Sequence, residues 1–98
     1  MAGGERWNVV AINGEAAGDY SVIVQNGRII GGFDDCTEWS FKTPESPIVV
    51  GDGAVCPPDE NREAYWTIVN ARRGDADWGE SEMVLEAEGQ QMAMRRPD

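Results

Sequence analysis

The chain has 98 residues and a formal net charge of −10, from eight Lys and Arg against eighteen Asp and Glu, and it contains no His. This length fits a single domain, 1–98, with one modest core and no separate cofactor-binding domain. The charge argues against nucleic-acid or anionic-membrane partners, which need clustered Lys and Arg, and the missing imidazole argues against an enzyme.

The first half of the chain predicts antiparallel strands. Residues 7–12 are rich in β-branched side chains and end at the turn dipeptide Asn13-Gly14. Residues 20–25 and 28–33 flank Asn26-Gly27, a dipeptide typical of two-residue hairpin turns. The pair Gly31-Gly32 indicates a bulge or a close backbone approach.

The second half predicts shorter strands, one helix and a closing hairpin. Residues 39–42 and 48–50 are the short strands. A helix from about Pro58 to Arg73 has carboxylates in its first turn, and Tyr65, Ile68 and Val69 form one apolar stripe. Residues 83–87 and 91–95 then flank a turn around Gly89-Gln90.

This order of elements predicts an α+β domain. Its sheet is expected to be a small antiparallel sheet or a partly closed β-barrel with the single helix packed on it. Trp7 is expected in the core, with Met83, Met92 and Met94 filling irregular gaps. The longest aliphatic run, residues 9–12, is far too short to span a membrane.

The two cysteines, Cys36 and Cys56, leave three interpretations open. They fit a disulfide, two buried thiols or one reactive thiol. A bridge would contribute about 3 kcal/mol by restricting the unfolded chain. Zinc is not expected, because four ligands are needed and the chain has neither a CxxC motif nor His, and no other cofactor is predicted.

Two acidic loops and several tryptophans are the candidate partner-binding surface. The first loop surrounds Cys36, and the second contains Trp78, while Trp66 lies beside the apolar stripe of the helix. Their charge and aromatic rings favour a cationic protein or a small ligand. The candidate residues are Asp34, Asp35, Glu38, Trp39, Trp66, Asp75, Asp77 and Trp78.

The order of the motifs resembles the META domain family, the HslJ-like heat-shock and envelope proteins of bacteria. The matching segments are WNVVAINGE, NGRIIGGFDDCTEWSF, AVCPPDENREAYWTIV and the closing MVLEAEGQQMAMRR. Asp35 stands where the family usually has Gly, Thr37 stands where it has Asn, and the stretch between the cysteines is shorter than usual. The chain is therefore expected to be a short and divergent member.

The resemblance implies a non-catalytic domain that acts by binding, in the bacterial envelope or in stress tolerance. The alternative is an acidic inhibitor of a basic enzyme, similar to lysozyme inhibitors. If a leader has been removed ahead of the start Met-Ala-Gly-Gly, the protein is expected to be periplasmic or lipid-anchored, and otherwise cytoplasmic.

Overall fold

The computed structural model describes residues 5–25, 27–43, 48–51, 55–57, 59–72 and 81–96. Within these residues the chain forms eight strands and one helix, α1 (Glu60–Arg72). The strands are β1 (Glu5–Ile12), β2 (Glu15–Ala16), β3 (Tyr20–Gln25), β4 (Arg28–Asp34), β5 (Glu38–Phe41), β6 (Val49–Gly51), β7 (Glu82–Ala87) and β8 (Gln90–Arg95).

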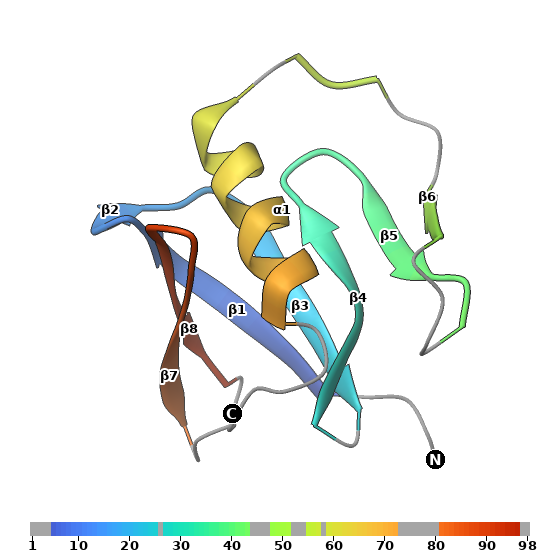
Figure 1. Cartoon of the computed structure of the whole chain (residues 1–98), viewed down its shortest axis with the longest axis horizontal. Coiled ribbons are helices and arrows are strands. Elements are labelled where there is room, and N and C mark those ends of the chain that lie inside the picture. Colours follow the sequence, from blue (N-terminus) through green and yellow to red (C-terminus); the bar gives the residue numbers. More distant parts are fainter. Residues whose placement is uncertain are drawn as a thin grey trace.

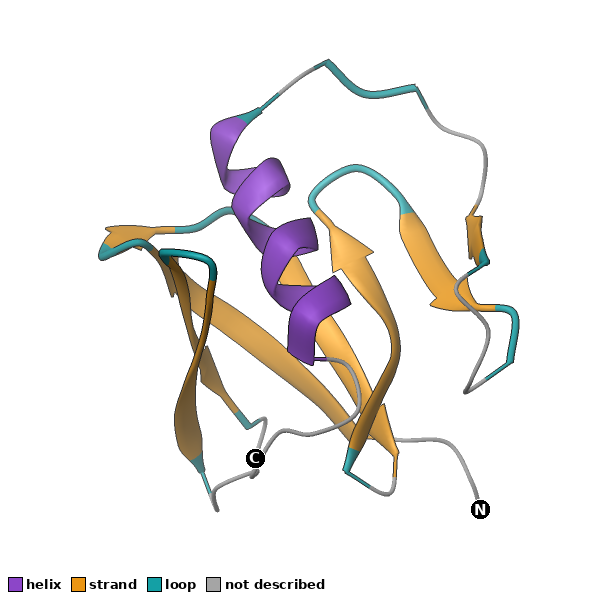
Figure 2. Cartoon of the chain, in the orientation of Figure 1, coloured by secondary structure: helices purple, strands orange, loops and turns teal. Residues whose placement is uncertain are grey.

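All strand pairs are antiparallel, and they build one sheet in the order β6-β5-β4-β3-β1-β8-β7, with β2 paired to β1. The sheet curls around α1, which lies across its concave face (Figure 1, Figure 2). The edge strands β6 and β7 do not pair with one another in the part of the chain that the structure describes. The predicted antiparallel sheet with one packed helix is confirmed, and of its two alternatives the open sheet is the one that forms.

The core lies between α1 and the concave face of the sheet. The predicted stripe of the helix is buried, and Trp7 and Met92 are 1% and 0% exposed, as expected for core residues. Met94 is also buried, and Met83 packs against this core from its edge. Burying each such side chain stabilises the fold by roughly 2 kcal/mol.

Two bulges keep apolar side chains turned toward the helix. In β1, the register against β8 shifts between Val9 and Ala11, so Val10 is the extra residue and is 42% exposed. The shift lets Val9 and Ile12, three positions apart, both face the core. In β4 the register against β3 shifts at Ile30, immediately before the glycine pair.

Of the two alternatives predicted at the glycine pair, the close backbone approach is present there, and a bulge lies one residue earlier, at Ile30. A Cβ on Gly32 would collide with the carbonyl oxygen of Ser21 and lie 2.6 Å from the Tyr65 hydroxyl. A Cβ on Gly31 would lie 2.7 Å from the Trp39 carbonyl oxygen. Only glycine therefore lets β4 pass this close to its neighbours.

Three turns join the hairpins as two-residue links. Asn13 and Gly14 have φ values of 53° and 83°, which the predicted turn at this dipeptide requires. The β3–β4 hairpin is confirmed by the pairing of Gln25 with Arg28, although Asn26 lies outside the described residues. The closing turn is at Glu88-Gly89, one residue earlier than predicted, because Gln90 already pairs with Ala87.

Helix α1 begins later than predicted. Asp59 caps it, since Asp59 Oδ1 accepts hydrogen bonds from the backbone N–H of Asn61 at 2.8 Å and of Arg62 at 3.3 Å. The first helical residue is therefore Glu60, and Pro57 precedes the cap. Pro58 and Arg73, the predicted ends, lie outside the described residues.

Candidate functional site

A disulfide between Cys36 and Cys56 joins the β4–β5 loop to the segment that precedes α1. Their Cα atoms are 6.3 Å apart, within the usual range for a disulfide. Of the three interpretations left open by the sequence, the structure supports the disulfide, and neither cysteine is free. Both residues are half-buried, and Thr37 Oγ1 lies 3.7 Å from the Cys56 sulfur.

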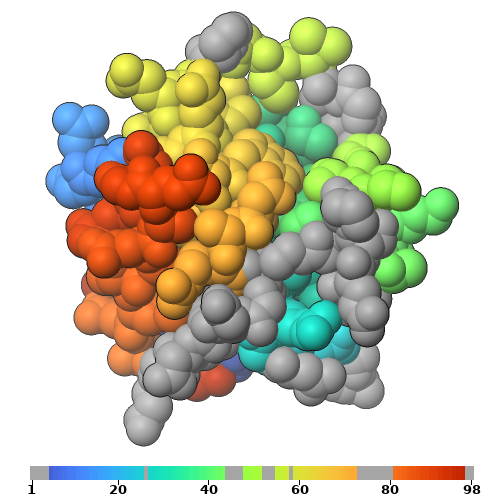
Figure 3. Space-filling view, viewed as in Figure 1, coloured from blue at the N-terminus to red at the C-terminus, as the bar shows by residue number. Residues whose placement is uncertain are grey.

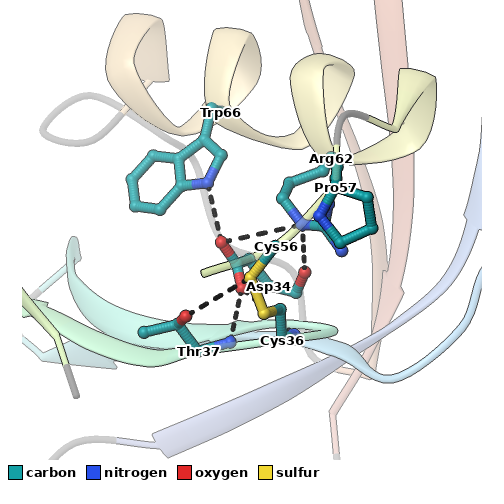
Figure 4. The surroundings of a disulfide bond; sticks show 7 residues. All are labelled: Asp34, Cys36, Thr37, Cys56, Pro57, Arg62 and Trp66. Carbon is teal, nitrogen blue, oxygen red and sulfur yellow. Dashed lines mark hydrogen bonds and ion pairs between the residues drawn. A yellow bond between two sulfur atoms is a disulfide. The ribbon is translucent and has the colours of Figure 1, made fainter. Parts of the chain in front are cut away.

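The side chain of Asp34 organises the surroundings of this disulfide (Figure 4). Its Oδ1 accepts hydrogen bonds from the backbone N–H of Cys36 at 3.2 Å and of Thr37 at 2.8 Å, which fixes the β4–β5 loop. Its Oδ2 accepts a hydrogen bond from Trp66 Nε1 at 3.0 Å, which joins the same loop to α1.

Arg62 completes the connection between the loop, the helix and the Cys56 segment. Arg62 Nε donates to the Asp34 carbonyl oxygen at 3.1 Å and lies 4.0 Å from Asp34 Oδ2. Arg62 Nη1 donates to the Pro57 carbonyl oxygen at 2.6 Å. The Arg62 side chain is only 16% exposed, so its charge is directed inward and balanced by that of Asp34.

Tyr65 connects α1 to the centre of the sheet. Its hydroxyl donates to the Ser21 carbonyl oxygen at 2.6 Å and accepts from Trp39 Nε1 at 3.0 Å. Burial raises the pKa of the Tyr65 hydroxyl well above its ordinary value, although the Trp39 hydrogen bond acts in the opposite direction. This hydroxyl is therefore neutral and structural at any physiological pH.

These contacts correct part of the expected partner-binding surface. Asp34 is 6% exposed and Trp39 is 3% exposed, so neither belongs to the surface. Asp34 is buried because it satisfies the amides of a tight loop, and Trp39 because its ring packs against the rings of Phe41, Tyr65 and Trp66.

The other expected surface residues are placed differently. Asp35 and Glu38 are exposed, as expected, and Trp66 is half-buried. The Glu38 carboxylate is 2.8 Å from Arg6 Nη2, so an ion pair offsets its charge. The second acidic loop lies outside the described residues, and with it Asp75, Asp77 and Trp78.

The antiparallel topology gathers carboxylates at one end of the molecule, which we call the acidic end. They come from β2, from the loops before β3 and after β4, from the start of α1 and from the β7–β8 turn, all at the end where α1 begins (Figure 1). All seven are exposed, and none forms an ion pair within the described part of the chain. The acidic end comprises Glu15, Asp19, Asp35, Asp59, Glu60, Glu63 and Glu88.

The local sequence does not predict the acidic end, because its seven carboxylates are spread over most of the chain. The positions of the predicted turns could have indicated it, since every second turn of an antiparallel meander lies at the same end of the sheet. Cationic side chains of the described segments lie toward the opposite end, where β8 and α1 finish. They include Arg28, Lys42, Arg72, Arg95 and Arg96.

Two cavities flank the exposed side of α1, which crosses the middle of the face in Figure 3 between the β7–β8 hairpin and the green strands. A polar cavity of about 340 Å³ lies between the helix and the turns that carry Asn13 and Gln90. A more apolar cavity of about 470 Å³ lies on the other flank, which we call the helix-flank pocket. It is lined by Cys56, Pro57, Asp59, Arg62, Glu63, Trp66 and Thr67.

Among the described residues, no group of three or more Cys, Asp or Glu side chains is placed to hold a metal ion. Within the same part of the chain, no helix has the length and apolar character needed to cross a membrane.

Comparison of the chain with protein-family models, with curated proteins and with solved structures found no match.

Proposed function

We propose that this chain is a non-catalytic, META-like binding domain that acts in the bacterial envelope or in stress tolerance and docks a cationic partner at its acidic end. The observation that carries the proposal is the gathering of seven exposed carboxylates without ion pairs at one end of the described structure. Such a surface attracts a basic partner over long distances and repels acidic ones.

Two features support the proposed envelope location and the proposed family. Disulfides persist in oxidising compartments, and the bond between Cys36 and Cys56 fits an envelope protein better than a cytoplasmic one. Asp35, which replaces the usual family Gly, has a φ of 69°. A loop that needs this left-handed conformation explains why the family pattern has glycine there.

The alternative function, an acidic inhibitor of a basic enzyme, is favoured by the same charge and by the disulfide. Small inhibitors need a rigid surface, and the disulfide and the Asp34 contacts hold the β4–β5 loop next to the acidic end. The two functions differ in whether docking blocks the catalytic cleft of the partner.

One experiment tests both. We would titrate the protein into lysozyme, a small basic enzyme, and into cytochrome c, a basic protein of similar size, while measuring binding calorimetrically and muramidase activity in parallel. Binding without loss of activity supports the binding-domain function, whereas loss of activity supports the inhibitor. If neither basic protein binds at low salt, docking through the acidic end is wrong.

A charge-matched pair of variants localises the interaction. Glu15→Gln with Asp19→Asn removes two charges from the acidic end, and Glu5→Gln with Glu82→Gln removes two charges from the opposite end, where β1 and β7 begin. We expect the first pair to weaken binding roughly three- to tenfold and the second pair to have less effect. Equal weakening by both pairs would show that net charge alone, rather than the acidic end, attracts the partner.

A further inference from the structure

We propose that the helix-flank pocket accepts the side chain of a lysine or arginine from the cationic partner. The inference rests on the proposed function and deepens it, because it names the group that the partner inserts. The pocket volume of about 470 Å³ lies within the range of roughly 300–1,000 Å³ that is typical of ligand sites.

The walls of the pocket are fixed before any ligand arrives. Trp66 is held by its hydrogen bond to Asp34 and by its packing on Trp39, with ring centroids 4.5 Å apart. Cys56 is held by its disulfide to Cys36, and Pro57 by the hydrogen bond from Arg62. A preformed pocket loses little conformational entropy on binding.

The charges around the pocket favour a cation. Arg62 lines the pocket, but its guanidinium is directed toward Asp34 and the Pro57 carbonyl, and Asp34 balances its charge. The remaining charged side chains of the lining are Asp59 and Glu63, which are both exposed carboxylates. An anionic ligand would therefore meet two like charges.

The lining also explains why a long cationic side chain suits the pocket. The apolar surface of Pro57, Cys56 and Trp66 matches the methylene stem of a lysine or arginine. Its charged head would meet the carboxylates of Asp59 and Glu63, which line the same pocket. An indole ring beside a cation adds a favourable cation–π interaction. A neutral apolar side chain would gain only the first of these contributions.

The direct test uses small probes and isotope-labelled protein, with the indole N–H signal of Trp66 as the readout. The probes are N-acetyl-lysine methylamide, its N-acetyl-norleucine counterpart without the charge, and N-acetyl-glutamate methylamide. We expect the lysine probe to shift the Trp66 signal at a concentration at least threefold lower than the norleucine probe, and the glutamate probe to be the weakest.

Glu63→Gln and Glu60→Gln provide a matched pair of variants. Both remove one carboxylate from the first turns of α1, but Glu60 lines the polar cavity and not the helix-flank pocket. We expect Glu63→Gln to weaken lysine-probe binding at least threefold more than Glu60→Gln. Equal shifts by the lysine and norleucine probes, or equal effects of the two variants, would overturn the proposal.

The outcome for the pocket is separable from the outcome for the proposed function. If lysozyme binds but the probes and Glu63→Gln have no effect, the acidic end docks the partner without this pocket. If the lysine probe binds as expected but no basic protein does, the pocket is a cation site and the proposed docking of a basic protein is wrong.

Discussion

At the residue scale, Asp34 does more than any other described carboxylate to hold the candidate site together. Its two side-chain oxygens accept hydrogen bonds from Cys36, Thr37 and Trp66, and its charge balances that of the inward-facing Arg62. A buried carboxylate stabilises the fold only when all of its hydrogen-bond and charge partners are in place. Removing the carboxylate leaves those partners unsatisfied, which is destabilising.

We predict that Asp34→Ala lowers the free energy of unfolding by about 3 kcal/mol, and that Asp34→Asn lowers it by about half as much. Asn keeps an oxygen for the amides of the loop but loses the charge beside Arg62. Urea denaturation followed by circular dichroism measures both changes. Asp35→Asn, at the exposed neighbouring position, is the control, and a loss as large as that of Asp34→Ala would contradict the role given to Asp34.

The turn at Glu88-Gly89 offers a stabilising change. Glu88 has a φ of 51°, a conformation that suits asparagine much better than glutamate, and the turn at Asn13-Gly14 already has Asn at the equivalent position with a φ of 53°. We predict that Glu88→Asn raises the free energy of unfolding by about 0.5–1 kcal/mol, measured by urea denaturation. Glu86→Asn, in the adjacent strand, should instead be destabilising, because Asn is disfavoured in strands.

The two tyrosines predict how stability depends on alkaline pH. Burial raises the pKa of Tyr65 and of Tyr20, and the Asp59 carboxylate adds to the effect at Tyr20. In the unfolded chain both hydroxyls ionise near pH 10, whereas in the folded chain they hold their protons. Above about pH 10 the unfolded state therefore binds fewer protons, and the stability falls as pH rises.

The measurement is the ultraviolet absorbance of tyrosinate during an alkaline titration, beside circular dichroism of the fold. We expect the absorbance to rise only when the fold is lost, because the chain has just two tyrosines and both are protected. In concentrated guanidinium the same titration should have its midpoint near pH 10. Tyrosinate absorbance that appears near pH 10 while the fold is intact would refute the prediction.

For single helices and strands, local sequence patterns are sufficient to predict the structure wherever an element's geometry depends on its own residues. Local sequence patterns predict three features that the structure contains: the hairpin at Gln25 and Arg28, the apolar stripe of α1 and the core position of Trp7. The two prolines predict too early a helix start, because proline is common in a first turn, whereas the capping side chain of Asp59 determines the boundary. The two-residue strand β2 is too short to leave any pattern.

The candidate site was harder to predict, because it depends on contacts between distant elements. The segment 34–39 contains acidic and aromatic residues that suggested a surface, yet Asp34 and Trp39 face inward. Their partners, Trp66 and Tyr65, lie 32 and 26 residues away on α1. No local signal says that a helix will cover that end of β4 and β5.

The disulfide is the element-scale feature with the largest expected effect. The double variant Cys36→Ser with Cys56→Ser removes a disulfide between residues with a sequence separation of 20. The chain-entropy relation predicts that the free energy of unfolding then falls by about 3 kcal/mol. Urea denaturation of the double variant measures the loss, and the reduced wild-type protein should unfold at the same urea concentration. Mass spectrometry with and without reductant supplies the control, because reduction adds the mass of two hydrogen atoms. A double variant as stable as the oxidised protein would contradict the prediction.

Across the whole molecule, the charged side chains of the described residues are distributed unevenly, with seven carboxylates at the acidic end and five cationic side chains toward the opposite end. The principal extents are 34 × 30 × 26 Å, so at about 10 mM salt, where the screening length is ~30 Å, nearly all charges interact with one another. The ion pairs of Arg95 with Glu82 and of Arg96 with Glu5 are exposed and contribute little. Among the described residues, repulsion within the acidic end is therefore an electrostatic contribution that no ion pair offsets.

Because repulsion at the acidic end is not offset by ion pairs, we predict that added salt stabilises the fold. Between about 10 mM and about 200 mM NaCl, screening should raise the free energy of unfolding by about 1 kcal/mol, which corresponds to a rise in Tm of roughly 4–8 °C for a domain of this size. The variant with Glu15→Gln, Asp19→Asn and Glu88→Gln carries less repulsion at the acidic end, so its Tm should be higher at low salt and should rise less. A Tm that falls as salt is added would mean that the exposed ion pairs contribute more than the repulsion does. The acidic end would then carry no unbalanced charge for a cationic partner to neutralise. If the variant and the wild-type protein respond equally to salt, the repulsion originates elsewhere on the molecule.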